Sequence, residues 1–163
     1  MEFRVFITNL GKYNEGELVG KWIDLPCDNI EDELAEIGVE TETQYEEYFI
    51  TNYENNFGYE VGEYENLWEL NDLAERLQQV DDLVWLTAYM DETGESLDEA
   101  INNYEDNSLW YDGMTLKEVA EELVDETEDL SDFAKRYFDY DAFAHDLRID
   151  GYVEYDGGVL YVY

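Results

Sequence analysis

Negative charge constrains this chain more than any other feature of its sequence. Residues 22–116 contain 27 Asp and Glu side chains but a single basic one, Arg76. Over all 163 residues, 44 acidic side chains face 8 Lys and Arg, which gives a net charge of −36. Because repulsion among like charges opposes a compact fold, we expect the function of the protein to depend on this charge.

The rest of the composition predicts a folded protein. Disordered chains combine high charge with low hydrophobicity, but here 45% of the residues are hydrophobic, 16% are aromatic and only one is proline. Such a chain can bury a core. Its length allows one domain, or two to three small ones.

The sequence also disfavours several partners and compartments. The lone cysteine, Cys27, excludes an intramolecular disulfide, and the N-terminal residues lack a signal-peptide pattern, so we expect a cytoplasmic protein. No apolar run approaches the roughly 18 residues that cross a bilayer. An acidic surface is repelled by anionic lipid and by nucleic acid. We therefore predict no membrane and no nucleic acid among its partners, which should be basic protein surfaces.

The N-terminal region has the two-residue period of strands. Strands are predicted at residues 3–8, 18–24 and 45–53, and the first two form a hairpin joined by a loop at 9–16.

Helix signals begin between the second and third of these strands. A short helix is predicted after Asp28, its N-cap, and before Gly38, its stop signal. From Asn66 onward, apolar residues recur with the 3.6-residue period of helices. Ser96 and Thr115 each open a capping box, so further helices should begin at the residues that follow them.

Two more helices, at 132–138 and 140–147, precede a C-terminal β-hairpin at 151–163. The predicted fold class is α+β: an elongated chain of three small domains with β-containing ends and a helical middle. The predicted domains are 1–61, a small β-sheet plus a helix; 62–105, helical; and 106–163, helices plus the C-terminal hairpin.

The expected elongation follows from the density of charge. Duplex DNA carries one charge per about 1.7 Å of axis, so 36 charges correspond to about 60 Å of duplex. A compact globule of this length has a radius of gyration of about 15 Å and a diameter of about 40 Å. If the carboxylates imitate DNA, the chain must be extended.

Few residues could serve catalysis. The nucleophile and base candidates are Cys27, His145, Ser96, Ser108 and Ser131, and a single imidazole exists to activate the others. We expect instead a buried thiol, a histidine near the end of a helix and, for two of the three serines, helix caps. Among 44 carboxylates, neighbouring pairs arise by chance and identify no glycosidase-like site. We predict that the protein is not an enzyme.

No cofactor is predicted either. The sequence lacks Cys and His at zinc-site spacing and lacks the calcium-loop pattern. Asp139 with Asp141, and Asp24 with Asp28, are weak oxygen-ligand pairs. The glycine-rich segments do not match a phosphate-binding loop.

Composition alone leaves several functions open. Carboxylates on a fixed surface can take the positions of phosphates and capture Arg and Lys in a DNA-binding groove. Alternatives are general acidic solubility or salt adaptation, a chaperone-like binder of basic proteins, and a hydrolase that uses a carboxylate pair.

Two segments resemble the ArdA-type antirestriction proteins. Residues 6–22 (FITNLGKYNEGELVGKW), followed by Leu25-Pro26, are similar to the N-terminal signature of that family. Residues 138–147 (FDYDAFAHDL) are similar to its C-terminal signature, although the family usually has arginine at the position of His145. Shorter matches are Tyr45-Glu46-Glu47-Tyr48 and Tyr53-Glu54.

The resemblance implies a cytoplasmic protein of mobile genetic elements that mimics bent B-form DNA. It implies binding to type I restriction-modification enzymes, whose inhibition protects incoming DNA. It also implies three small domains in a curved, elongated chain that pairs as a homodimer. The alternative is an acidic binder of other basic DNA-binding proteins, such as a histone-like or nucleoid-protein antagonist.

The candidate DNA-mimic surface consists of exposed acids in the middle and C-terminal parts. They are Glu63, Glu65, Glu69, Asp72, Glu75, Asp81, Asp82, Asp91, Glu92, Glu95, Asp98, Glu99, Glu105, Asp106, Glu121, Glu122, Asp125, Glu126, Glu128 and Asp129. A possible dimer contact involves Phe138, Tyr140 and Phe143.

Overall fold

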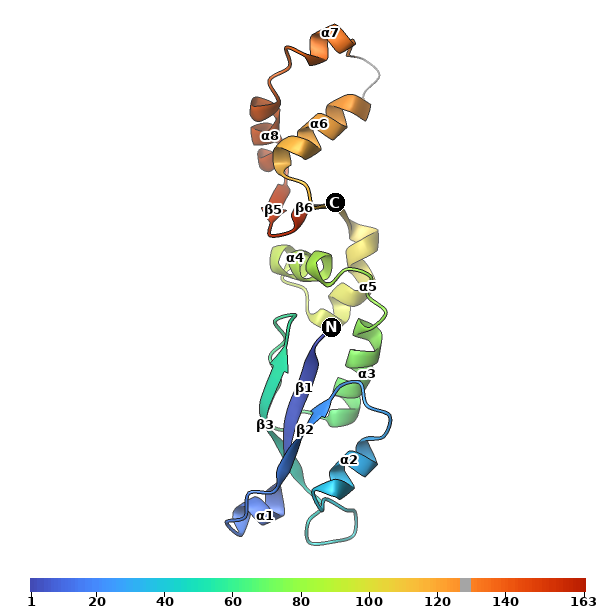
Figure 1. Cartoon of the computed structure of the whole chain (residues 1–163), viewed down its shortest axis with the longest axis vertical. Helices are drawn as coiled ribbons and strands as arrows, with labels where there is room; N and C mark the ends of the chain where they lie inside the picture. Colours follow the sequence, from blue (N-terminus) through green and yellow to red (C-terminus); the bar gives the residue numbers. More distant parts are fainter. Residues whose placement is uncertain (127–129) are drawn as a thin grey trace. The chain divides into compact units, whose positions relative to one another are not determined.

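A computed structural model describes residues 1–126 and 130–163, which form eight helices and six strands. The chain divides into two compact units, Met1–Leu83 (unit 1) and Val84–Tyr163 (unit 2). Each contains a three-stranded antiparallel sheet with helices packed beside it (Figure 1). The predicted mixture of helices and strands is confirmed. The finer division into three domains stays a prediction.

Unit 1 is built on a sheet with the strand order β2-β1-β3. The predicted hairpin and third strand are confirmed, with boundaries shifted by a few residues. The elements are β1 (Phe3–Asn9), α1 (Leu10–Asn14), β2 (Gly20–Asp24), α2 (Ile30–Glu36), β3 (Tyr48–Asn55) and α3 (Leu67–Leu77).

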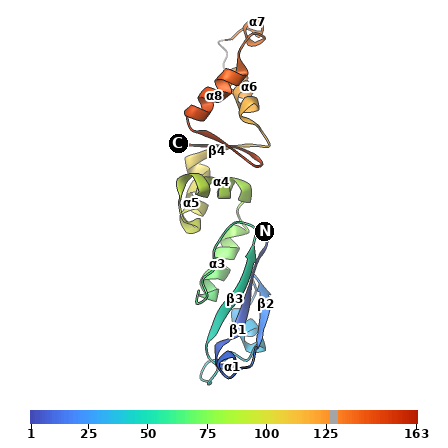
Figure 2. The same ribbon diagram turned by 90° about the vertical axis from the view of Figure 1, so that its left-hand side faces the viewer.

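The core of unit 1 follows from the alternation along β1. Phe3, Val5 and Ile7 are buried, and α3 lies along one face of the sheet (Figures 1 and 2). The buried stripe of α3 begins at Leu67 and returns at Leu70, Leu73, Ala74 and Leu77, the spacing of one helical face. The apolar side chains that alternate along β1 and those on one face of α3 are thus both buried in unit 1.

The predicted loop at 9–16 is wrong, because residues 10–14 form the short helix α1. Asn9 is fully buried, and its Oδ1 accepts a hydrogen bond from the Lys12 N–H at 2.9 Å, which caps the helix. Its Nδ2 donates to the carbonyl oxygens of Ile37 and Gly38, each at 3.1 Å. One asparagine therefore joins the end of β1 to the segment that follows α2.

The N-cap of α2 is Asn29 rather than the predicted Asp28. The Asn29 Oδ1 accepts from the backbone N–H groups of Glu31 and Asp32 at 3.0 and 3.4 Å. Both residue types are good caps, so the sequence did not distinguish them. The predicted stop is confirmed: Gly38 has a φ of +73°, which suits glycine.

Unit 2 has the strand order β4-β6-β5 and contains the predicted C-terminal hairpin, β5 with β6. Both capping boxes are present, at the starts of α5 and α6. The elements are α4 (Leu83–Thr93), α5 (Leu97–Asn107), β4 (Ser108–Asp112), α6 (Leu116–Glu126), α7 (Asp132–Lys135), α8 (Tyr140–Ile149), β5 (Tyr152–Tyr155) and β6 (Gly158–Val162).

Strand β4 was not predicted. It follows α5 directly, has five residues, and pairs with β6, which lies far along the chain. Its position is fixed by Ser108, whose hydroxyl donates to the Tyr104 carbonyl at 2.6 Å and accepts from the Trp85 Nε1–H at 2.8 Å. These bonds connect β4 to α4 and α5.

The main core of unit 2 lies between α6, α8 and the sheet (Figure 1). Tyr111 of β4 packs at its border next to Tyr152, with 6.1 Å between ring centroids. Burial, followed by the neighbouring Tyr152, raises the pKa of Tyr111 to about 12, so its hydroxyl stays protonated at neutral pH. The fully or nearly buried members of this core are Leu116, Val119, Ala120, Leu147 and Val159.

We predict that Asn9→Ala destabilises unit 1 by about 3 kcal/mol, because it leaves buried backbone groups without partners. Urea unfolding followed by circular dichroism measures this change. The matched control is Asn14→Ala in the same helix, an exposed side chain, which should change the free energy of unfolding by less than about 0.5 kcal/mol. Equal effects of the two substitutions would contradict the role given to Asn9.

Candidate anionic interaction surface

The candidate acids that the structure describes are all exposed or partly exposed. Glu128 and Asp129 fall outside the described residues. Of the other eighteen, none is buried: fourteen are exposed, and the partly buried ones are Glu65, Asp82, Glu95 and Glu122. Every described member of the set can therefore present negative charge to solvent.

Helix α6 has five acidic residues among its 11, four of them candidates. One face is buried in the core through Leu116, Val119 and Val124. The acidic residues follow the complementary spacing i, i+3, i+4, i+7, i+8 and so occupy the opposite face. They are Glu118, Glu121, Glu122, Asp125 and Glu126.

Glu118 belongs to this acidic face but was interpreted from the sequence only as the last residue of a capping box. Its carboxylate accepts from the Thr115 N–H and from the Thr115 hydroxyl, both at 2.8 Å. These hydrogen bonds lower the pKa of Glu118. The capping carboxylate therefore stays ionised and adds to the charge of the face. The spacing of acidic residues along α6 in the sequence could have identified Glu118 as a member of this face.

Helices α3, α4 and α5 also carry exposed acids. Their acids flank the buried stripe of each helix, so packing of the apolar residues turns the carboxylates outward. The exposed acids are Glu69, Asp72 and Glu75 on α3; Asp91 and Glu92 on α4; and Asp98, Glu99, Glu105 and Asp106 on α5. Asp81 and Asp82 lie between α3 and α4, and Glu63 and Glu65 precede α3.

Some candidate acids also have structural partners. Glu65 accepts from the Tyr59 hydroxyl and from the Gly62 N–H, the latter at 2.7 Å. Glu95 accepts from the Tyr89 hydroxyl at 3.1 Å and from the Asn103 Nδ2 at 3.0 Å, which ties the end of α4 to α5. These carboxylates are held in place by the fold.

The few basic side chains are largely used inside the molecule. Lys21 pairs with Glu33 and Glu36 and thereby joins β2 to α2. Each basic side chain neutralises one negative charge and the chain has only 8 of them against 44 acids, so most of the negative charge is left unbalanced. Further pairs join Arg4 with Glu54, Lys12 with Glu17, Lys117 with Asp141, and Lys135 with Asp125.

The catalytic candidates gain no support from the geometry. Burial raises the pKa of the Cys27 thiol, which opposes formation of the nucleophilic thiolate. Cys27 lies in unit 1, and His145 is exposed on α8 of unit 2. Ser96 and Ser131 precede α5 and α7 as N-caps.

The described parts of the chain contain no group of three or more His, Cys, Asp or Glu side chains arranged to hold a metal ion. Within residues 1–126 and 130–163, no helix has the length and hydropathy of a membrane span.

The predicted dimer contact is partly occupied by internal packing. Phe143 packs against the core of unit 2 and lies 5.7 Å from Phe138 between ring centroids. The ring centroids of Tyr140 and Phe138 are 5.1 Å apart. The strongly exposed aromatic residues nearby are Phe133 and Tyr137. The contact stays a prediction.

The sequence matches the family model described as antirestriction protein (ArdA) over residues 5–161. The resemblance of the two terminal signatures is thus confirmed over nearly the whole length. Among curated proteins, no match to the chain is found.

We predict that Glu95→Ala destabilises unit 2 by about 1–3 kcal/mol, because the Tyr89 hydroxyl and the Asn103 amide lose their acceptor. Asp106→Ala, at an exposed position of α5, is the control. It removes an acid from the negative end of a helix and should leave stability unchanged or slightly raised. Thermal unfolding of both variants decides whether Glu95 is structural.

Proposed function

Because the chain belongs to the ArdA family of antirestriction proteins, we propose that it is an acidic DNA mimic that inhibits type I restriction-modification enzymes. In this proposal, its carboxylates occupy the groove in which such an enzyme binds DNA. The enzyme then fails to cleave incoming mobile DNA. The protein acts in the cytoplasm, by binding alone, without a catalytic step or a cofactor.

The acidic face of α6 is the observation that carries the proposal. This helix has five carboxylates in 11 residues. At about 1.5 Å per residue it is about 16 Å long, so it has one carboxylate per about 3.3 Å. Phosphates along one DNA strand are spaced by about 3.4 Å of axis. The carboxylates of the helix therefore have about the same axial spacing as the phosphates of a single strand.

Such a surface suits a groove built to hold phosphates. Arg and Lys of the enzyme form charge-assisted hydrogen bonds with carboxylates as they do with phosphates. The acids of α3, α4 and α5 add further exposed charge, so binding energy is spread over many contacts. No single substitution is then expected to abolish inhibition, and affinity falls as salt is added.

The homodimer, the three-domain division and the elongated form belong to the same proposal. They are supported by the family and by the charge argument, because 36 charges at the density of DNA need about 60 Å of length. A partner groove that accommodates bent DNA also requires a long ligand.

A DNA-cleavage assay with a purified type I enzyme tests the function. The protein, titrated against fixed DNA, should inhibit cleavage, and Glu121→Gln/Glu122→Gln/Glu126→Gln should inhibit less well. At about 0.2–1 kcal/mol for each exposed pair, three lost contacts weaken binding roughly three- to hundredfold. The substitutions relieve repulsion within α6, so a folding defect is not expected.

The matched control is Glu17→Gln/Glu36→Gln/Glu54→Gln. It has the same net charge, −36 + 3 = −33, but removes acids that already pair with Lys12, Lys21 and Arg4. Inhibition by this control should stay close to that of the unaltered protein. If the two triple variants lose inhibition equally, only net charge matters and the role of α6 is refuted.

Small-angle scattering tests the proposed shape. A dimer of two 19.2 kDa chains is expected, with a radius of gyration well above the about 20 Å of a compact 326-residue particle. A monomer with a radius near 15 Å would contradict both the dimer and the elongated form.

A further inference from the structure

An exposed aromatic cluster lies at the β3 edge of unit 1. The Tyr13 and Phe49 rings make an edge contact with 5.2 Å between centroids, and Tyr64 stacks on Phe49 at 6.5 Å. Phe49 is 5% exposed, whereas Tyr13 and Tyr64 are 53% and 72% exposed. The two tyrosines therefore cover Phe49 and turn much of their own surface to solvent. We call Tyr13, Phe49 and Tyr64 the tyrosine patch.

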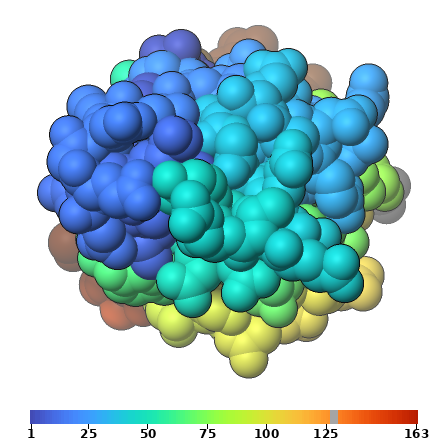
Figure 3. Space-filling model, turned by 90° about the horizontal axis from the view of Figure 1, so that it is seen from below, coloured from blue at the N-terminus to red at the C-terminus, as the bar shows by residue number. Residues whose placement is uncertain are grey.

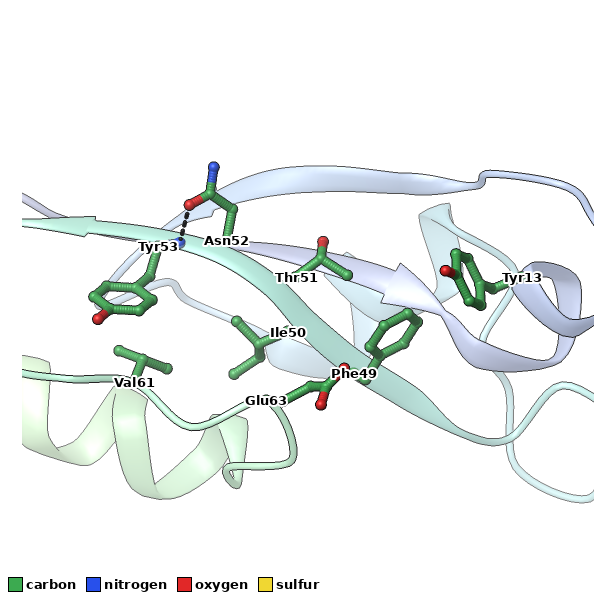
Figure 4. A pocket seen from close by; sticks show the side chains of 8 residues that line it. All are labelled: Tyr13, Phe49, Ile50, Thr51, Asn52, Tyr53, Val61 and Glu63. Carbon is green, nitrogen blue, oxygen red and sulfur yellow. Dashed lines mark hydrogen bonds between the residues drawn. The ribbon is translucent and has the colours of Figure 1, made fainter.

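Two open cavities adjoin the tyrosine patch. One, of about 380 Å³, runs along β3, and Figure 4 shows Tyr13 and Glu63 on either side of Phe49 within it. The other, of about 340 Å³, is lined by Tyr64, Glu46 and Glu47 together with Leu10 and Tyr48.

The same end of unit 1 is seen in Figure 3, where the α1 segment (blue) lies beside the segment between α2 and β3 (cyan). The backbone joins them there, because the Leu10 N–H donates to the Glu47 carbonyl at 3.0 Å.

The carboxylates at these cavities differ from neighbouring carboxylates in their hydrogen bonds and ion pairs. Glu15 accepts from the Tyr45 hydroxyl at 2.8 Å and Glu17 pairs with Lys12 at 3.3 Å. Within the described residues, the side chains of Glu46, Glu47 and Glu63 form no such hydrogen bond or ion pair. Their charge faces the cavities together with the tyrosine rings.

Elsewhere in unit 1 the chain itself places a cation between a ring and a carboxylate. The Arg4 guanidinium lies 4.9 Å from the centroid of the Trp22 ring and pairs with Glu54. The Lys12 ammonium lies 4.9 Å from the Tyr45 ring centroid and pairs with Glu17. In both arrangements a basic side chain lies on a ring and pairs with a neighbouring acid.

We propose that the tyrosine patch, with Glu46, Glu47 and Glu63, binds an arginine side chain of the basic protein that this chain inhibits. The inference rests on the proposed function for its partner class and adds a specific contact to it. A guanidinium is planar, stacks on an aromatic face and forms paired hydrogen bonds with a carboxylate. The patch thus selects among cations, which a plain array of carboxylates does not.

Titration of the full-length protein with N-acetyl-arginine amide tests the binding site directly. We expect saturable chemical-shift changes of the Tyr13 and Tyr64 ring resonances in NMR spectra. N-acetyl-citrulline amide, which is neutral and nearly isosteric, should cause none. Equal responses to both compounds, or changes spread evenly over all acidic residues, overturn the proposal.

Two variants and two matched controls locate the site. Tyr64→Leu removes the ring face and Glu63→Gln removes the charge, and each should weaken arginine-amide binding by about two- to fivefold. Tyr163→Leu, at a residue 69% exposed in unit 2, and Glu60→Gln, at an exposed position, should not. Tyr64→Phe keeps the ring and should bind like the unaltered protein, which separates loss of the ring from damage to the fold.

The enzyme assay then asks whether a restriction enzyme uses the site. Tyr13→Leu/Tyr64→Leu keeps the net charge of −36 and should inhibit DNA cleavage at least threefold less well than the unaltered protein. Unchanged inhibition by this variant overturns the proposed contact and leaves the antirestriction function intact. If the unaltered protein itself fails to inhibit, the proposed function is wrong, and the contact with an inhibited enzyme falls with it, whatever the arginine-amide titration shows.

Discussion

Repulsion between carboxylates is the force that the rest of this structure must overcome. On α6, acids three and four residues apart face one another, an arrangement that destabilises an isolated helix. The helix is held because Leu116, Val119 and Val124 pack into the core of unit 2. The same burial directs the carboxylates to solvent. Stability and surface charge therefore come from two faces of one helix.

The scarce basic side chains serve the fold instead of balancing the charge. Lys21 joins β2 to α2, and Lys117 joins α6 to α8 through Asp141. Arg4 lies on Trp22 and pairs with Glu54 across the sheet. These bases are placed between elements, and the acidic surplus remains exposed at the surface. That division between internal and external electrostatics suits a protein that functions by binding basic surfaces.

Local signals were predicted well and distant pairings poorly. The capping boxes at Ser96 and Thr115 were predicted correctly because a cap is made by residues within one turn. The strand β4 was missed because its partner β6 comes much later in the chain. A loop at 9–16 was predicted where the structure has α1, because helix caps and turns use the same residue types. The acidic surface could be predicted from composition and helical period alone, whereas the tyrosine patch could be recognised only from the folded structure.

The sequence by itself determined the sign and density of the charge, the helical and strand periods, and membership of the family through its two signatures. These are properties of composition and of neighbours along the chain. Only the tertiary structure decided which acids have internal partners, such as Glu95 with Tyr89, and which rings meet, such as Tyr13 and Tyr64 over Phe49. The ring contacts join residues distant in sequence, and the geometry of both kinds of contact depends on how sheet and helices pack.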